Sequence, residues 1–275
     1  MQLTPRYGPD PIVVIDDVGG IVEATVRQRK RLAATLEGLD DAGWAHPSRC
    51  EGWSMRDVMV HLESTNGFWS WSIQAGLAGD PTRFLATFDP VASPADLVAG
   101  SSATAAEVLA AFRASNAALA GLLGSLDAEQ LAVQAEAPPG HQSVAAVAHH
   151  ALWDSWVHER DILLPLGIEP EVEDDEVAAC LRYAAALGPA LGVGRGDASG
   201  GSLTVRATDP EVAFTVSATD HVRIGPVDPG VDRVLEGDAV DLVEAISLRQ
   251  PFAPAHAEAA AWLVGGLEVA FDVAD

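Results

Sequence analysis

The sequence predicts an α+β protein of two domains, a helical bundle followed by a small α+β unit. Three observations support this prediction. Capped stretches with apolar residues at helical spacing follow one another as far as residue 170. A glycine-rich run then occupies residues 192–201. Beyond it the apolar pattern changes to a period of two, which is typical of strands.

The composition is that of a globular protein. The chain has 275 residues, of which 48% are hydrophobic and 20% are charged, enough for a sizeable core in one or two domains. The formal net charge of −24 should repel nucleic acid and anionic membranes. We find no targeting segment and no long apolar run, and two cysteines make no disulfide framework. We therefore expect a soluble protein of the reducing cytoplasm, a monomer or a homodimer.

The first part of the chain predicts a loose arm and the first three bundle helices. Residues 1–19 begin with prolines and predict a loosely held arm. The first helix is expected over residues 20–39. Ser54, with Asp57 three residues on, resembles a capping box, so the second helix begins there. A long stretch rich in alanine and leucine, residues 95–126, is expected as the third helix.

The fourth bundle helix, with Ser143 as its expected N-cap, holds the most informative residues. Asp154 and His158 stand four residues apart, so on a helix they lie on the same face. A metal ion would partner this carboxylate and imidazole together, given a third ligand from another helix. For such a pair alone, a buried Asp–His hydrogen bond is the commoner arrangement. His150 is expected in a supporting position or at the surface.

The best candidate for the third ligand is His61, on the second predicted helix. It lies on the flank of an apolar stripe, beside Thr65. Taken alone, a histidine in such a place is more often a hydrogen-bonded residue at the edge of the core than a ligand. The aromatic side chains of Phe68, Trp69 and Trp71 follow within about two turns and could line the mouth of a pocket.

Two motifs in these helices give a resemblance. Residues 52–62 read Gly-Trp-Ser-Met-Arg-Asp-Val-Met-Val-His-Leu, and residues 156–161 read Trp-Val-His-Glu-Arg-Asp. Together they resemble the mycothiol-dependent maleylpyruvate isomerase family, which belongs to the DinB-like metal-binding four-helix bundles. The resemblance covers residues 20–168 well and the C-terminal part more loosely.

The resemblance implies a ligand set and two cofactors. The family's ligands, a histidine ending the first motif and a Glu-x-x-x-His pair, correspond to His61, Asp154 and His158, with Asp here in place of Glu. A divalent metal, zinc in the first place, and mycothiol as the thiol cosubstrate are implied as well. The family also uses an arginine of the C-terminal domain to assist a carboxylate substrate. Arg249 matches it best, although Leu-Arg-Gln departs from the usual Gly-Arg; Arg83 is a weaker candidate.

We therefore expect a metal- and thiol-dependent isomerase or S-transferase that acts on a small, electrophilic, anionic substrate. The chain has no obvious nucleophile, since Cys50 precedes the helix of His61 and Cys180 lies in an apolar run. An external thiol is then the economical nucleophile, because a metal deprotonates a thiol that binds it. Two alternatives stay open: a hydrolase using metal-activated water, with Glu63 or Glu159 as base, and a non-enzymatic metal- or ligand-binding module.

The C-terminal part predicts a small α+β unit, similar to the sterol-carrier-like domain that accompanies the family's bundle. Its strands are expected over residues 202–207, 212–217, 222–224, 231–235 and 267–272, and its helices over 174–187, 239–248 and 256–264. The predicted division is an arm (1–19), a DinB-like metal-binding bundle (20–170), a connecting helix with a glycine-rich linker (171–201) and a sterol-carrier-like domain (202–275).

Overall fold

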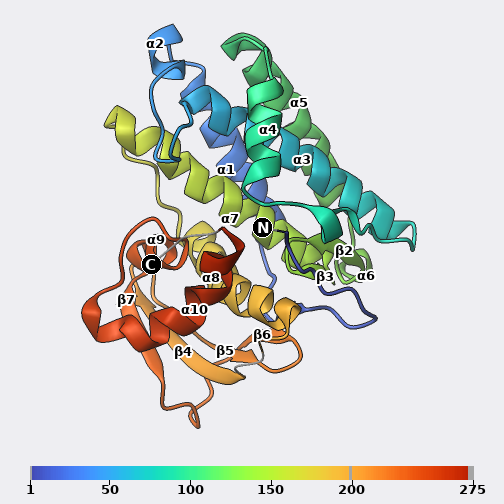
Figure 1. Ribbon diagram of the computed structural model, residues 1–275, viewed down its shortest axis with the longest axis vertical. Coiled ribbons are helices and arrows are strands. Elements are labelled where there is room, and N and C mark those ends of the chain that lie inside the picture. The colour runs from blue at the N-terminus through green and yellow to red at the C-terminus, as the bar shows by residue number, and fades with distance from the viewer. Residues whose placement is uncertain (1, 198–199, 272–275) are drawn as a thin grey trace.

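The computed structural model describes residues 2–197 and 200–271. A helical half and a half built on a mixed sheet lie at opposite ends of the long axis of the molecule (Figure 1). The α+β class and the order of its two parts are confirmed.

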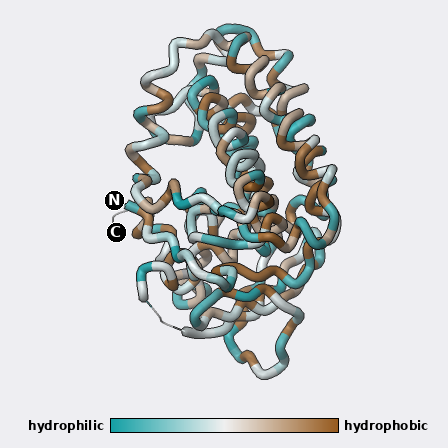
Figure 2. Tube along the Cα trace, turned by 90° about the vertical axis from the view of Figure 1, so that its right-hand side faces the viewer, coloured by the Kyte–Doolittle hydropathy of each residue, from teal (hydrophilic) through white to brown (hydrophobic). Residues whose placement is uncertain are grey.

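Four long helices form the N-terminal bundle. They are α1 (Ile21–Leu36), α3 (Met55–Leu77), α5 (Ala105–Gly124) and α7 (Val144–Leu163). Helices α1 and α3 each pack against both α5 and α7, so the four close a ring around a shared core. Hydrophobic and hydrophilic segments alternate along these helices (Figure 2), as helices with one buried side require. Helix α7 is the exception, because it is buried on nearly all sides.

The capping residues place the two helices that carry the site. The Ser54 side chain accepts a hydrogen bond from the Asp57 N–H, and the Asp57 carboxylate accepts one from the Ser54 N–H. The predicted capping box of α3 is therefore confirmed. Ser143 caps α7 by accepting from the N–H of Ala146, also as expected.

The single helix expected over residues 95–126 is wrong. Helix α4 (Ala92–Gly100) ends before Ser101, and α5 begins after Thr104. Thr104 and Glu107 form a capping box of their own. Serine and threonine side chains bond to nearby backbone groups in competition with the helix, and the run from Ser101 to Thr104 therefore interrupts it.

The C-terminal half is built on a five-stranded sheet in the order β1–β6–β5–β4–β7. Its strands are β1 (Val13–Ile15), β4 (Gly201–Thr208), β5 (Val212–Ala218), β6 (Val222–Gly225) and β7 (Val234–Asp238). The three central strands are antiparallel neighbours, whereas both edge strands pair in parallel. The strands expected over 202–207, 212–217 and 222–224 are confirmed, and the one expected over 231–235 lies later, as β7.

Helix α8 (Asp174–Arg195) joins the two halves, because it packs against α1 and α7 on one side and against β5 and β6 on the other. Helices α9 (Ala239–Ile246) and α10 (Ala257–Ala270) pack against α8 in turn. Shorter elements complete the chain: α2 (Asp41–Trp44), α6 (Ala128–Leu131), the hairpin β2 (Gln134–Ala137) and β3 (Gly140–Ser143), and the 3-10 turns η1 (Phe84–Thr87), η2 (Leu164–Leu166) and η3 (Pro254–His256).

The N-terminal arm is not loosely held, contrary to the prediction from its prolines. Val13 and Ile15 pair with Val222 and Ile224 of β6, and all four side chains are buried. The first segment of the chain therefore supplies an edge strand to the sheet of the last. A strand this short gives no periodic signal, and its partner lies near the other end of the sequence. The division at residues 19, 170 and 201 stays a prediction.

The glycine-rich segment is partly helical rather than a linker throughout. Helix α8 runs through Pro189 to Arg195, and Gly196, with φ of 80°, ends it; residues 198–199 lie outside the described residues. A side chain on Gly188 would place its Cβ 1.8 Å from the carbonyl oxygen of Leu263 on α10. Gly188 precedes the glycine-rich run in the same helix, and it allows the close packing of α8 against α10.

The strand expected over residues 267–272 is wrong as far as it is described. Helix α10 continues through Leu267 to Ala270, and Asp272 lies outside the described residues. The helix expected over 256–264 is its first part. The helix expected over 239–248 is α9, and Asp238 caps it by accepting hydrogen bonds from the N–H groups of Val240 and Asp241.

Helices α5 and α8 are each long and apolar enough to cross a membrane by length and composition alone. Most of the apolar stretch of α8 is buried inside the protein, whereas most of that of α5 is not. Helix α5 forms one wall of the bundle.

Replacing Gly188 by Ala should destabilise the protein, because the added methyl group meets the backbone of α10. We expect the free energy of unfolding to fall by about 1–3 kcal/mol, measured by urea denaturation. Gly121→Ala on α5 is the matched control. A Cβ at that position meets nothing within 4 Å, so this change should be neutral or stabilise by up to about 1 kcal/mol. Equal stability of the two variants would contradict the close helix crossing.

Candidate metal centre

Three side chains from two helices converge at one end of the bundle. His61 extends from α3, and Asp154 and His158 extend from α7. Asp154 Oδ1 lies 3.7 Å from Nε2 of His61 and 3.7 Å from Nε2 of His158. The side chains are 16%, 12% and 12% exposed, so the cluster lies just beneath the surface. The structure thus brings together the three residues named from the sequence, and their role as metal ligands stays a prediction.

The separations fit a tetrahedral ion. Bonds of about 2.0–2.1 Å to nitrogen and oxygen place neighbouring ligand atoms about 3.4 Å apart. The observed 3.7 Å is close to this value, yet too long for a hydrogen bond between the groups. All three ligand atoms lie within 4.8 Å of one another. A divalent ion would therefore fit here with small movements, and the buried Asp–His hydrogen bond considered as an alternative is not formed.

The charges favour an ionised carboxylate. Burial on its own would raise the pKa of Asp154, but the facing imidazoles of His61 and His158 lower it well below its usual range. The other carboxylate oxygen accepts a 3.4 Å hydrogen bond from the Thr65 hydroxyl. Behind it, the buried guanidinium of Arg29 donates to Asn66 and to the carbonyl of Ala151. Burial lowers the pKa of Arg29 to about 10, against the raising effect of Asp154.

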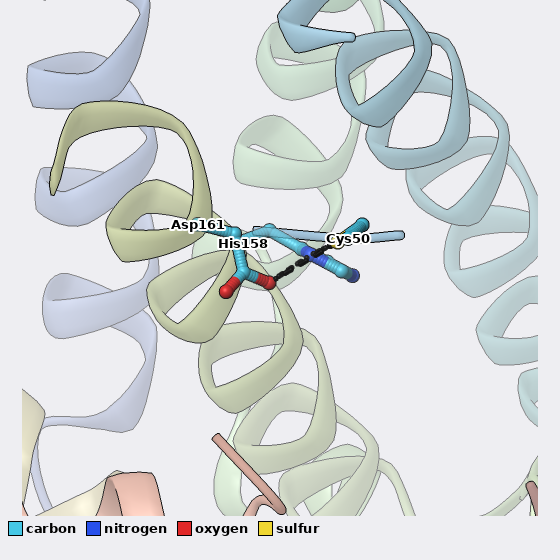
Figure 3. A group of neighbouring side chains, drawn as sticks. All are labelled: Cys50, His158 and Asp161. Carbon is cyan, nitrogen blue, oxygen red and sulfur yellow. Dashed lines mark hydrogen bonds and ion pairs between the residues drawn. The ribbon is translucent and has the colours of Figure 1, made fainter. Parts of the chain in front are cut away.

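The other nitrogen of His158 is held by Asp161, which the sequence analysis did not single out. Nδ1 of His158 lies 3.0 Å from Asp161 Oδ2, one turn along α7. Figure 3 shows this contact together with Cys50, which comes from the segment before α3. A histidine that binds a metal through one nitrogen usually donates the other N–H to a carboxylate. The spacing of three residues between His158 and Asp161 was a signal that could have found it.

Cys50, His158 and Asp161 also lie close enough to hold an ion, but their surroundings disfavour one. Arg249 donates to both carboxylate oxygens of Asp161 at 2.9–3.1 Å, and Arg49 lies 3.5 Å from one of them. Asp161 is fully buried, and both arginines are partly exposed. A second cation there would compete for oxygens that are already paired, so the first cluster is the better metal site.

Arg249 does not extend freely towards the open side of the cluster. Besides Asp161, it donates from Nη1 to the carbonyl of Ser247 at 3.3 Å. It belongs to a set of charges that joins the two halves of the protein. In that set Glu244 of α9 pairs with Arg49 and, at 3.3 Å, with Arg160 of α7. The role in substrate binding that the resemblance implied for Arg249 stays a prediction.

His150 is buried, so the surface position considered for it is wrong. It stands one turn from Asp154 on α7, at the same spacing that joins Asp154 to His158. Its ring lies 4.7 Å from that of Trp69, and its Nδ1 lies 2.8 Å from the hydroxyl of Tyr183. Burial lowers the pKa of His150 to about 4, so the imidazole is neutral at pH 7.

The remaining candidate residues lie away from the three ligand atoms. Glu159 is buried between helices, where Gln28 and Arg31 bond to its carboxylate. Cys180 is buried in α8. Arg83 is exposed and stacks over the ring of Tyr7 at 5.4 Å. The predicted aromatic cluster exists, since Phe68 contacts both Trp69 and Trp71.

Comparison with known proteins places the chain in a family. A family model described as the mycothiol maleylpyruvate isomerase N-terminal domain matches residues 26–163, half of the chain. The chain belongs to this family. The match contains both motifs and all three ligand candidates. Among curated proteins, a comparison by sequence finds no match.

Solved structures agree on the fold of this family member. Crystal structures of the mycothiol-dependent maleylpyruvate isomerase and of one of its mutants each align with a TM-score of 0.59 at 15% identity. Each alignment covers 85% of this chain and 90% of the other. A probable metal-dependent hydrolase of Bacillus subtilis is a more distant match, with a TM-score of 0.43, 16% identity, and coverage of 61% and 95%. The first likeness confirms a DinB-like bundle followed by an α+β part.

Stability of the protein stripped of divalent ions should fall as pH rises through the alkaline range. Burial disfavours a charged His158, but Asp161, Cys50 and Asp154 outweigh burial and raise its pKa from 6.5 to about 10. The stabilisation is therefore complete below pH 6.5 and is lost as pH approaches 10. Urea denaturation at several pH values should show this slope, and His158→Gln should flatten it. The control His221→Gln, at an exposed histidine, should keep the wild-type slope. If His158→Gln showed a slope as steep as that of the wild type, the raised pKa of His158 would not be its cause.

Proposed function

We propose that this family member binds one divalent ion, zinc in the first place, through Nε2 of His61, Oδ1 of Asp154 and Nε2 of His158. We propose further that it uses a mycothiol-type thiol to isomerise, or to transfer sulfur to, a small electrophilic anion. The observation that supports the site is the position of Asp154 Oδ1, 3.7 Å from each imidazole nitrogen. Membership of the family supports the thiol.

One carboxylate and two neutral imidazoles would leave a divalent ion with a net positive charge and an open position, where a bound thiol loses its proton at neutral pH. The residues of the chain supply the orientation. Asp161 fixes the ring of His158 through Nδ1, and Thr65 holds the second oxygen of Asp154. The indole of Trp53 packs 5.6 Å from the ring of His61. None of these contacts uses an Nε2 atom, so both stay directed at Asp154.

The nucleophile is expected to come from outside the chain. Cys180 is buried in α8, and burial raises the pKa of its thiol well above the ordinary value. Cys50 contacts Nδ1 of His158 and Asp161 instead of the Nε2 side where the three ligand atoms converge. Both cysteines are free, which agrees with a reducing, cytoplasmic location, and neither is placed to attack a substrate at the cluster.

The proposed reaction needs no reagent besides the thiol and the electrophile. The sulfur of the thiolate adds to an electrophilic alkene carbon, and the pair of electrons of the double bond moves to the activating carbonyl group. The resulting carbon–carbon single bond rotates. Loss of the thiolate restores the double bond as the other isomer, whereas protonation of the adduct completes an S-transfer. The same site would thus serve either outcome.

An anionic substrate suits the rim of the site in spite of the net charge of −24. Next to His158, Arg49, Arg160 and Arg249 pair with the carboxylates of Asp161 and Glu244. These five side chains together carry one positive charge, and the ligand cluster would add to it when it holds a metal. Such a local field attracts a small carboxylate.

Neither glutamate named as the base of the hydrolase alternative is placed to serve the cluster. The carboxylate of Glu159 forms an ion pair with Arg31 at 2.9 Å. Glu63 follows His61 by two residues, which turns it to about the opposite side of α3. Because metal-assisted hydrolysis depends on a positioned base, we favour the thiol chemistry, and a binding module without turnover remains an outcome of the tests.

Metal analysis tests the ligand set directly. We expect about one divalent ion per chain after dialysis, and loss of it in His61→Ala and Asp154→Asn. Loss of a direct ligand should lower the metal affinity by more than loss of an outer hydrogen-bond partner, which costs about 10–100-fold. Asp154→Glu should retain the ion, and His221→Ala, at an exposed histidine away from the site, should match the wild type. Full occupancy in His61→Ala would show the ligand set to be wrong.

Turnover assays test the reaction. We expect the metal-loaded protein to isomerise or thiolate an electrophilic cis-alkene dicarboxylate or keto acid only when mycothiol is supplied. Removal of the metal with a chelator should abolish the activity, and reloading should restore it. Equal turnover without thiol would favour the hydrolase. Metal binding without turnover of any thiol–electrophile pair would favour the binding module.

A further inference from the structure

We infer that Arg249 is a positioning residue of the metal centre: it acts through Asp161 on His158, so that the docked C-terminal half strengthens metal binding by the bundle. This inference rests on the proposed function, because it takes His158 as a ligand. It differs from the role in substrate binding that the resemblance implied, and the two roles predict different measurements.

The nitrogens of Arg249 are already engaged. Nε lies 2.9 Å from Oδ1 and 3.1 Å from Oδ2 of Asp161, and Nη2 lies 2.9 Å from Oδ2. Nη1 donates to the carbonyl of Ser247. Two nitrogens thus face one carboxylate, which is the strongest arrangement available to an arginine. A substrate carboxylate could take the fork formed by Nε and Nη2 only after Asp161 had lost these contacts.

Asp161, which Arg249 holds in place, in turn orients the proposed ligand His158. Its Oδ2 accepts from Arg249 and also lies 3.0 Å from Nδ1 of His158. The carboxylate is fully buried, so it cannot replace a lost partner with bulk water. Without Arg249 the carboxylate would keep only one arginine, Arg49, which lies 3.5 Å from Oδ1, and would be free to turn towards it. Such a turn loosens the ring whose other nitrogen faces Asp154.

The backbone around Arg249 supports a fixed position. Leu248, the preceding residue, has φ of 60°, a left-handed conformation that is unfavourable for leucine. The Arg249 N–H bonds to the carbonyl of Glu244 at 2.8 Å, and the neighbouring Ser247 hydroxyl accepts from the indole of Trp153 on α7 at 2.8 Å. The turn that ends α9 is thus attached to α7 by two contacts, from Ser247 to Trp153 and from Arg249 to Asp161.

The coupling crosses the boundary between the two halves. The three proposed ligands all belong to the bundle, whereas Arg249 follows α9 in the C-terminal half. Glu244 of α9 adds a parallel attachment through Arg49 and Arg160. Movement of α9 away from α7 would remove Arg249 from Asp161. The metal affinity of the bundle therefore depends on how the C-terminal half is docked.

The test is metal affinity in the full-length protein, with Co²⁺ and Zn²⁺ in competition with a chromophoric chelator. Arg249→Gln should bind both ions about 10–100-fold more weakly, as expected for the loss of an outer partner. The visible absorption bands of bound Co²⁺ should shift, because the field of His158 changes. Arg233→Gln, which removes an exposed ion pair with Glu258 in the same half, should leave affinity and spectrum unchanged.

A double variant tests whether Arg249 acts through Asp161. Asp161→Asn should weaken binding by itself, and adding Arg249→Gln should cost little more, because both changes remove the same path. Additive losses would overturn the inference. Arg249→Lys keeps the charge but not the two parallel donors, so its metal affinity should lie between those of the wild type and Arg249→Gln. It replaces Arg249→Gln in the test if that variant does not fold.

The outcomes separate this inference from the proposed function. If Arg249→Gln binds metal within about twofold of the wild type, well inside the loss expected for an outer partner, while turnover falls, Arg249 serves the substrate. The inference is then overturned and the metal centre stands. If the wild type itself binds neither ion, the proposed function fails, and the inference fails with it.

Discussion

The buried contact between Asp161 and His158 is the interaction on which the site depends. A carboxylate without access to water needs cationic partners, and Asp161 finds them in Arg249, Arg49 and the imidazole. Its bond to Nδ1 turns the other imidazole nitrogen towards Asp154 and His61. One buried charge therefore links the orientation of a candidate ligand to the attachment of the C-terminal half.

The same charges would allow so acidic a protein to hold the anionic substrate proposed for it. Forty acidic residues oppose sixteen basic ones, and the chain as a whole repels anions. At the rim of the site, however, three arginines meet two carboxylates, and the arginines come from α7, α9's end and the segment before α3. Local fields decide binding within about one Debye length, roughly 8–10 Å. The overall charge then governs the long-range behaviour of the protein rather than its chemistry.

Most residues of the candidate site could be predicted, because their spacing along a helix places them on one face. Asp154 and His158 share a helix face by their spacing, and the capping box of Ser54 sets the phase of the helix that carries His61. The same rule extended one turn in each direction would have placed His150 inside and Asp161 beside His158. Arg249 was found only by resemblance, and its partner could not be predicted, because the two residues meet through the folding of separate halves.

The class of fold, the caps of α3 and α7, the central strands and the face on which the ligand candidates lie can all be predicted from local sequence. These features depend on the hydrogen bonds and periodicity of neighbouring residues. Three other features emerge only when the chain has folded: Val13–Ile15 completes the distant sheet, Gly188 serves a helix crossing, and Arg249 binds Asp161. Each of these contacts joins residues far apart along the chain. Their energies come from burial and pairing that exist only after the chain has folded, so no local pattern records them.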